Sequence, residues 1–273
     1  MKSIAFGQYY PADSVLHRLD PRIKVVLTVL YIVCTFLCKN LLSFALLVLS
    51  ALLLILLGKI PLKIILGGLR PVLIILLFTA FLNIFWTKGE QPLFAWQFIQ
   101  IYAEGLYSAA FIMIRIAALI IGTGMLLTYT TTPIALTDAL EDLMSPLKKL
   151  HVPVHDFAMM MTIALRFIPT LVEETDKIMT AQKARGADFS TGSLVSRAKA
   201  LIPVLIPLFV SAFNRAGDLA VAMECRCYHG DGLRTRMHVR KCRFSDIAAL
   251  FVMILFGASL VALNILGIGY TLA

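Results

Sequence analysis

Long runs without a charged residue are the feature that most constrains this chain. Residues 247–273 hold no charged side chain over 27 positions, and residues 41–57 and 71–87 are each uncharged over 17. A helix that crosses a bilayer needs about 20 apolar residues, with a range of roughly 17–25. Because 59% of the residues are hydrophobic and only 15% are charged, the composition indicates an integral membrane protein rather than a soluble domain.

The apolar runs predict an all-α membrane protein with five membrane-spanning helices. Lys24 interrupts the first run and Arg115 the fourth, and the two residues Lys39 and Asn40 separate the first two runs, which predicts a tight connection. The expected spans are residues 22–38, 41–58, 69–87, 105–128 and 246–268.

The distribution of basic residues predicts the orientation and the domain organisation. Residues 129–245 carry fifteen Lys or Arg, whereas residues 88–104 carry one Lys and two Glu. Basic loops stay on the cytoplasmic side, so we expect a cytoplasmic N-terminus and an outer C-terminus. The predicted parts are a membrane domain with four spans at 1–128, a cytoplasmic region at 129–245, and a final span with a short outer C-terminus at 246–273.

The cytoplasmic region is expected to hold amphipathic helices that form a layer at the membrane surface. Leucines at helical spacing favour one helix over residues 136–150. Two further helices are predicted to start at Pro169 and Pro207, since proline is tolerated in a first turn. Both would end at an arginine between two small residues, and Gly186 suits a left-handed C-cap. The two triplets are Ala184-Arg185-Gly186 and Cys225-Arg226-Cys227.

An arginine at a helix end has two readings. It can complement the helix dipole and cap the last carbonyl groups. It can also enter a groove on another protein and pair with a carboxylate there, and small neighbours would let the partner approach the backbone. The repetition of the pattern favours the second reading, although spacing alone leaves both open.

Several segments together resemble the transmembrane subunit of energy-coupling factor (ECF) transporters, the EcfT family. They are "GQYYPADSVLHRLDPRIKVV", "LRPVLIILLFTAFLNIFW", "ALRFIPTLVEETDKIMTAQKARGADF" and "PLFVSAFNRAGDLAVAMECRCYHG". The resemblance runs over nearly the whole chain. It implies that the helices carrying the triplets are coupling helices, and that Arg185 and Arg226 with their flanking residues dock onto a pair of cytoplasmic ATPases. The cysteines of the second triplet depart from the commoner Ala/Ser-Arg-Gly pattern.

The resemblance also implies the partners and the transported substances. Two ABC-type ATPases would bind ATP and Mg²⁺, so this chain would need no cofactor of its own. A membrane substrate-binding S component would select a vitamin or another micronutrient, and several such components could share one module. The expected location is the bacterial cell membrane. Independently of the resemblance, the sequence has no Walker A pattern, G-x-x-x-x-G-K-[ST], which excludes a P-loop in this chain.

Other functions fit the sequence less well. A stand-alone secondary transporter is the alternative, but the interiors of the five expected spans contain no Asp or Glu, since Asp246 stands at the first position of the last span. A membrane enzyme would need a convergent catalytic set that we cannot assemble.

Three other features of the sequence have simpler explanations. The spacing typical of zinc sites is matched poorly by Cys225, Cys227, His229, His238 and Cys242. The basic run 234–243 favours membrane anchoring over nucleic-acid binding. Arg115 is expected to pair with a carbonyl or an acidic group inside the helix bundle, and the alternative is that it reaches an interface between subunits.

Overall fold

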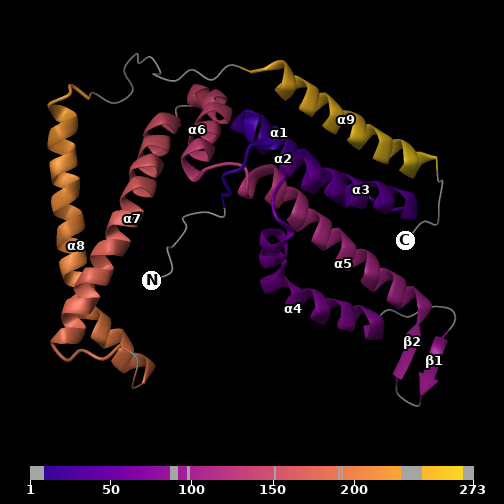
Figure 1. Cartoon of the computed structure of the whole chain (residues 1–273), viewed down its shortest axis with the longest axis horizontal. Helices are drawn as coiled ribbons and strands as arrows, with labels where there is room; N and C mark the ends of the chain where they lie inside the picture. The colour runs from indigo at the N-terminus through magenta and orange to yellow at the C-terminus, as the bar shows by residue number, and fades with distance from the viewer. Residues whose placement is uncertain are drawn as a thin grey trace. The chain divides into compact units, whose positions relative to one another are not determined.

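The computed structural model describes residues 9–86, 92–96, 99–150, 152–189, 191, 193–228 and 242–266. The chain forms two compact units, Met1–Ala139 with Val239–Ala273 (unit 1) and Leu140–His238 (unit 2). Helices make up most of both units (Figure 1). The helices are α1 (Val15–Arg18), α2 (Pro21–Leu37), α3 (Leu41–Gly58), α4 (Leu62–Trp86), α5 (Ala103–Thr123), α6 (Pro133–Leu143), α7 (Val154–Ala184), α8 (Leu194–Glu224) and α9 (Phe244–Ile265). A π-helical turn, Gly124–Thr128, extends α5, and a 3₁₀ helix, Ser145–Leu150, follows α6.

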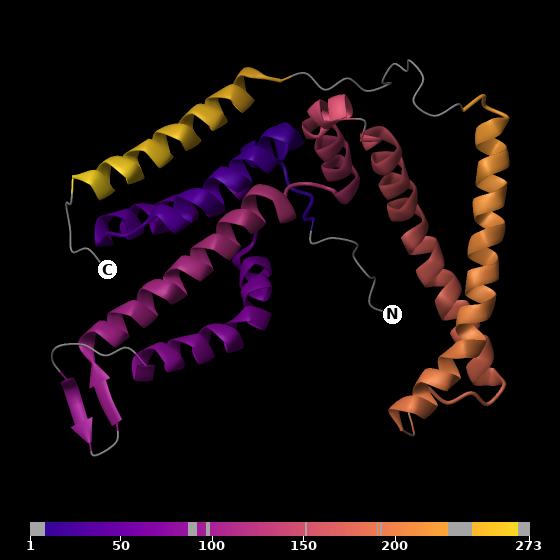
Figure 2. The ribbon, with the colours of Figure 1, turned by 180° about the vertical axis from the view of Figure 1, so that it is seen from behind.

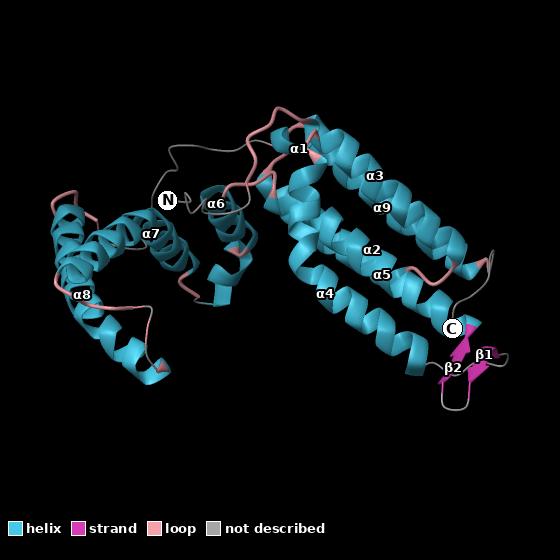
Figure 3. Ribbon diagram, turned by 60° about the horizontal axis from the view of Figure 1, so that its bottom comes forward, coloured by secondary structure: helices cyan, strands magenta, loops and turns pink. Residues whose placement is uncertain are grey.

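The predicted all-α membrane class is confirmed, with one small addition. Strands β1 (Pro92–Trp96) and β2 (Ile99–Tyr102) pair as an antiparallel hairpin before α5 (Figure 3). The register changes between Pro92 and Phe94. No strand was predicted for these residues, because the sequence shows no clear alternation of apolar and polar residues.

Five described helices are long and apolar enough to cross a membrane. Four coincide with expected spans: Leu41–Gly58, Leu62–Phe85, Gly105–Thr128 and Phe244–Ile265. The fifth is Val195–Glu224, which we had placed in the cytoplasmic region, and the expected span 22–38 is not among them. This helix, α2, has only 17 residues and includes Lys24. It is shorter and less uniformly apolar than its neighbours, yet it lies at the centre of unit 1.

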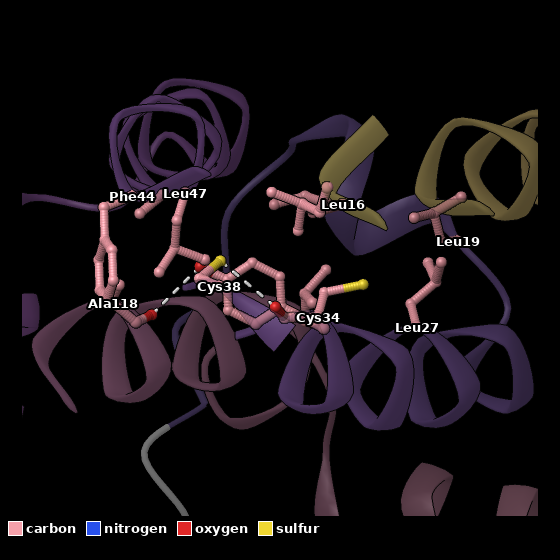
Figure 4. Packing of buried hydrophobic residues seen from close by; sticks show 12 residues of the cluster. Leu16, Leu19, Leu27, Cys34, Cys38, Phe44, Leu47 and Ala118 are labelled. Carbon is pink, nitrogen blue, oxygen red and sulfur yellow. Dashed lines mark hydrogen bonds between the residues drawn. The ribbon is translucent and has the colours of Figure 1, made fainter. Parts of the chain in front are cut away.

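The hydrophobic core of unit 1 is built around α2. Leu27, Tyr31 and Cys34 of this helix are buried, and they join one cluster with residues of α3, α5 and α9 (Figure 4). The connection at Lys39 and Asn40 is as tight as expected, since α2 ends at Leu37 and α3 begins at Leu41. The outer faces of α3, α4 and α9 remain largely apolar and exposed, which suits contact with lipid.

Polar side chains in the core of unit 1 bond to backbone groups. The hydroxyl groups of Thr28 and Thr35 donate to the carbonyls of Lys24 and Tyr31, at 2.7 and 2.8 Å. The Tyr31 hydroxyl donates to the Ala118 carbonyl at 3.3 Å. Each group thus has a partner where water is excluded, as an apolar surrounding requires.

Unit 2 consists mainly of α7 and α8, two helices of 31 residues each that cross one another (Figures 1 and 2). The expectation that they begin at Pro169 and Pro207 is wrong, because both prolines lie inside longer helices. Ile163 and Phe167 before Pro169, and Leu171 after it, all line one groove against α8. This continuous packing offsets the backbone hydrogen bond that a proline removes.

The expected single helix over residues 136–150 is also wrong. Helix α6 ends at Leu143, and a 3₁₀ helix begins at Ser145. Pro146 lies at this break, and a proline cannot donate the hydrogen bond that would continue the α-helix.

Candidate docking site at two helix ends

The C-terminal end of α7 has the cap that the sequence predicts. Gly186 adopts a φ of +88°, a left-handed conformation that glycine accepts readily. Its N–H donates to the Lys183 carbonyl at 3.0 Å, and the Ala187 N–H donates to the Gln182 carbonyl at 3.0 Å. These two bonds form a Schellman motif, in which Arg185 is the last residue before the chain turns away.

The C-terminal end of α8 repeats this cap with a cysteine in place of the glycine. Cys227 adopts a φ of +55°. The Cys227 N–H donates to the Glu224 carbonyl at 2.8 Å, and the Tyr228 N–H donates to the Met223 carbonyl at 3.1 Å. Arg226 therefore occupies the same position in its cap as Arg185 does in the first.

All six residues of the two triplets are exposed: Ala184, Arg185, Gly186, Cys225, Arg226 and Cys227. Backbone N–H groups already bond the carbonyls that a capping arginine would reach. In the described ranges, neither guanidinium forms an ion pair or hydrogen bond with another residue. Both charged groups are consequently available to a partner protein.

An ion pair joins the two helices of unit 2. Arg215 of α8 donates to a Glu174 carboxylate oxygen of α7 at 2.7 Å. Toward the end of α7, the Gln182 amide donates to the Pro203 carbonyl at 3.4 Å, so residue numbers rise on one helix as they fall on the other. The helices are thus antiparallel, and their C-terminal ends point in opposite directions.

Arg185 and Arg226 lie equally far along their helices from the Glu174–Arg215 pair. Arg185 follows Glu174 by eleven residues, and Arg226 follows Arg215 by eleven residues. At 1.5 Å per residue, each arginine lies about 16 Å along its helix from the member of the ion pair on that helix. The sequence contained a signal for this pair that we missed: Glu174 and Arg215 are 41 positions apart, the same offset as the two arginines.

The two caps predict opposite effects of two substitutions. Gly186→Ala should destabilise unit 2 by about 1 kcal/mol, because a side chain disfavours a positive φ. Cys227→Gly should stabilise it by a similar amount, because glycine removes that strain. Thermal unfolding of the purified variants measures both. Gly217→Ala is the control within α8, since a Cβ there would meet no atom within 4 Å. If Gly186→Ala and Cys227→Gly changed the stability in the same direction, the two helix ends would not share the same cap geometry.

Arg115 is not part of this site. It lies in α5 of unit 1, where its guanidinium donates to the Cys38 carbonyl at 2.8 Å. The same group lies 5.1 Å from the centre of the Phe44 ring, within the range of a cation–π contact. The carbonyl contact is of the kind we expected, and any role beyond it stays a prediction.

No group of three or more His, Cys, Asp or Glu in the described part of the chain is arranged to hold a metal ion. His229 and His238, which we weighed for zinc, lie outside the described residues. Cys225, Cys227 and Cys242 are exposed.

Comparison with known proteins identifies the family. Residues 12–239 match the model of the CbiQ family, described as cobalt transport protein. A protein of Clostridium kluyveri, named energy-coupling factor transporter transmembrane protein EcfT, is 50% identical over 264 residues, which cover 96% of this chain and 97% of that protein. The chain belongs to the CbiQ/EcfT family.

Other EcfT proteins match over similar lengths. The EcfT of Ruminiclostridium cellulolyticum is 51% identical over 257 residues, covering 94% of this chain and 95% of that protein. The EcfT of Bacillus subtilis is 46% identical over 260 residues, covering 95% and 98%. The predicted resemblance to the EcfT family is confirmed, and the matched residues include both arginine triplets. This chain is accordingly a membrane component of a transporter.

Proposed function

We propose that this chain is the coupling subunit of an ECF-type importer. In this proposal, the ends of α7 and α8 dock onto two cytoplasmic ATPases, and the membrane helices hold a substrate-binding S component. ATP-driven movement of the ATPases then passes through α7 and α8 to the S component. Vitamins or other micronutrients are the proposed cargo, and ATP and Mg²⁺ bind to the ATPases rather than to this chain.

The matched geometry of the two arginine ends carries this proposal. Two like subunits present two like pockets. Arg185 and Arg226 offer two like side chains, with the same cap and the same distance along the helix from the Glu174–Arg215 pair. Guanidinium groups pair with carboxylates through two parallel hydrogen bonds. A single binding pocket would not require this repetition.

An apolar stripe on α8 supplies a surface for the membrane partner. Six large side chains recur at helical spacing along it, each 49–66% exposed: Ile202, Leu205, Ile206, Phe209, Val210 and Phe213. An apolar stripe of this length marks a protein or membrane contact. It also explains why α8 meets the length and composition of a membrane span. We assign it to contact with the S component and the lipid at the membrane surface.

The orientation follows from the basic residues. We propose that the N-terminus and residues 129–245 are cytoplasmic and that the C-terminus lies outside, because the long basic segment must face the ATPases. In this arrangement both arginine ends lie on the side of the membrane where ATP is available.

Affinity purification from the native membrane tests the function. The tagged chain should bring down two P-loop ATPases, or two copies of one, together with at least one small membrane protein, identified by mass spectrometry. Recovery of the chain alone, with uptake of a substrate when the chain is reconstituted without ATPases, would support a secondary transporter instead.

A further inference from the structure

The N-terminal motif "YYPADSVLHRLDPRIK", residues 9–24, has no role in the docking proposal. In unit 1 it lines a polar cavity of about 660 Å³. Residues 130–132, just after the π-helical turn, and the start of α9 complete the lining. Segments far apart in the sequence therefore build one cavity, at the end of the unit where α2 and α9 begin.

The charges around the cavity favour an anion over a cation. Three basic side chains line it, from Arg18, Lys24 and Arg243, against two carboxylates, Asp20 and Asp246. Asp246 is 1% exposed. Its two oxygens accept the Asp20 N–H at 3.0 Å and the Arg243 N–H at 2.7 Å.

The second carboxylate is engaged as well. Asp20 accepts the Arg22 N–H at 3.0 Å, as the N-cap of α2. Both carboxylates therefore hold helix ends in place, and the lining keeps a net positive charge.

The two arginines can donate to a ligand. Among the described residues, Arg18 pairs with Asp13 alone, at 3.9 Å, and their side chains are 72% and 94% exposed, so this pair is weak. Arg243 is exposed and engages Asp246 through its backbone N–H. Lys24, 2% exposed, donates to the Thr130 carbonyl at 2.9 Å and adds a fixed positive charge.

His17 is excluded as a ligand, since both ring nitrogens are engaged. Nε2 lies 2.9 Å from the Tyr10 carbonyl, which can only accept, so Nε2 carries a hydrogen. Nδ1 lies 2.7 Å from the Ser14 hydroxyl. His17 thus shapes the wall of the cavity and offers no further donor to it.

Thr131 gives an independent sign of a ligand. This residue lines the cavity and is 7% exposed. Its buried hydroxyl has no hydrogen-bond partner among the described residues. A buried hydroxyl without a partner is destabilising, whereas a hydroxyl that donates to a bound oxyanion is not.

We propose that this cavity binds a phosphate group, held by Arg18 and Arg243 and by the Thr131 hydroxyl. Guanidinium groups match phosphate oxygens geometrically. The phosphate can come from a lipid headgroup or from free inorganic phosphate. The cavity lies where the apolar helices α2 and α9 begin, which is the level of lipid headgroups beside a membrane span.

Titration calorimetry on the full chain in detergent tests the site. The probes are dioctanoyl phosphatidylglycerol, dioctanoylglycerol, which lacks the phosphate, and sodium phosphate. The variant is Arg18→Gln/Arg243→Gln. Its control is Lys63→Gln/Arg70→Gln, which removes two exposed charges from α4 of the same unit.

We expect the phospholipid to bind, dioctanoylglycerol to bind far more weakly, and the Arg18/Arg243 variant to lose at least about tenfold in phospholipid affinity. If sodium phosphate binds and the Arg18/Arg243 variant weakens its affinity to the same degree, free phosphate is the source of the bound group. No phosphate-dependent binding, or an equal loss in the Lys63/Arg70 control, would overturn the proposal.

Thr131→Val separates a ligand contact from a purely structural role. Without phosphate, the variant should unfold at the same or a higher temperature, because it removes an unpartnered buried hydroxyl. The rise in unfolding temperature on adding phospholipid should be smaller than in the wild type. An unchanged rise would place the hydroxyl outside the site and leave the proposal without its buried donor.

Discussion

Reversing the charge of either Arg185 or Arg226 should weaken docking of the ATPases at least about thirty-fold. A buried interface arginine typically contributes about 2 kcal/mol or more when it is removed, and a glutamate adds repulsion against an acidic pocket. Arg185→Glu/Arg226→Glu together should abolish co-purification of the ATPases from the membrane. Quantitative mass spectrometry of the purified complex measures the loss.

Arg197→Glu is the matched control, because Arg197 is exposed on α8 but lies in its first turns. Arg197→Glu changes the net charge of unit 2 by the same amount as Arg185→Glu or Arg226→Glu alone. We expect its complex to stay intact. An unchanged complex in the double variant, with the chain still in the membrane, would remove the docking role from both arginines and leave them as surface charges.

Gly122→Ala should destabilise unit 1 by about 2–3 kcal/mol. A Cβ at Gly122 would overlap the ring of Tyr31, which is 1% exposed and bonded to the Ala118 carbonyl. The Tyr31 ring lies inside the hydrophobic core of unit 1, so it cannot move away from a new Cβ without displacing the side chains around it. The midpoint of thermal unfolding in detergent, followed by size-exclusion chromatography, should fall clearly.

Gly67→Ala provides the comparison, since a Cβ on this residue of α4 would meet no atom within 4 Å. There the substitution should be neutral or slightly stabilising, as alanine is favoured over glycine in a helix. Adding Tyr31→Leu to Gly122→Ala should recover part of the lost stability by making space. A Gly122→Ala protein as stable as Gly67→Ala would contradict the packing of α2 against α5.

The sequence predicted the helices that depend on composition alone. Runs such as 41–57 leave no alternative to a long apolar helix, and α3 begins and ends within a residue of the prediction. Gly186 was also predictable, because a glycine after a helical pattern so often takes a positive φ. Arg185 and Arg226 were predictable as a repeated pattern, while their assignment to docking came from the family resemblance.

Features that depend on packing between distant segments were not predictable. Pro169 and Pro207 looked like helix starts, but both lie inside longer helices, and the groove between α7 and α8 gives α7 continuous packing across Pro169. Helix α2 looked like an ordinary span, yet the contacts of Tyr31 place it in the middle of unit 1. The polar cavity brings Arg18 together with Arg243, 225 positions apart. No local pattern encodes such a pairing.

The equal distances of Arg185 and Arg226 from the Glu174–Arg215 pair have a mechanical consequence. Because the helices are antiparallel, the two tips lie on opposite sides of that pair, at equal distances along the helices. If the two helices turn as one body and the two tips are displaced equally in opposite directions, the centre of the turn lies at that pair. The pair would then stay in place while both tips move. Moving Arg226 one helical turn along α8 would make the two distances unequal, so the same tip displacements would also shift the pair sideways.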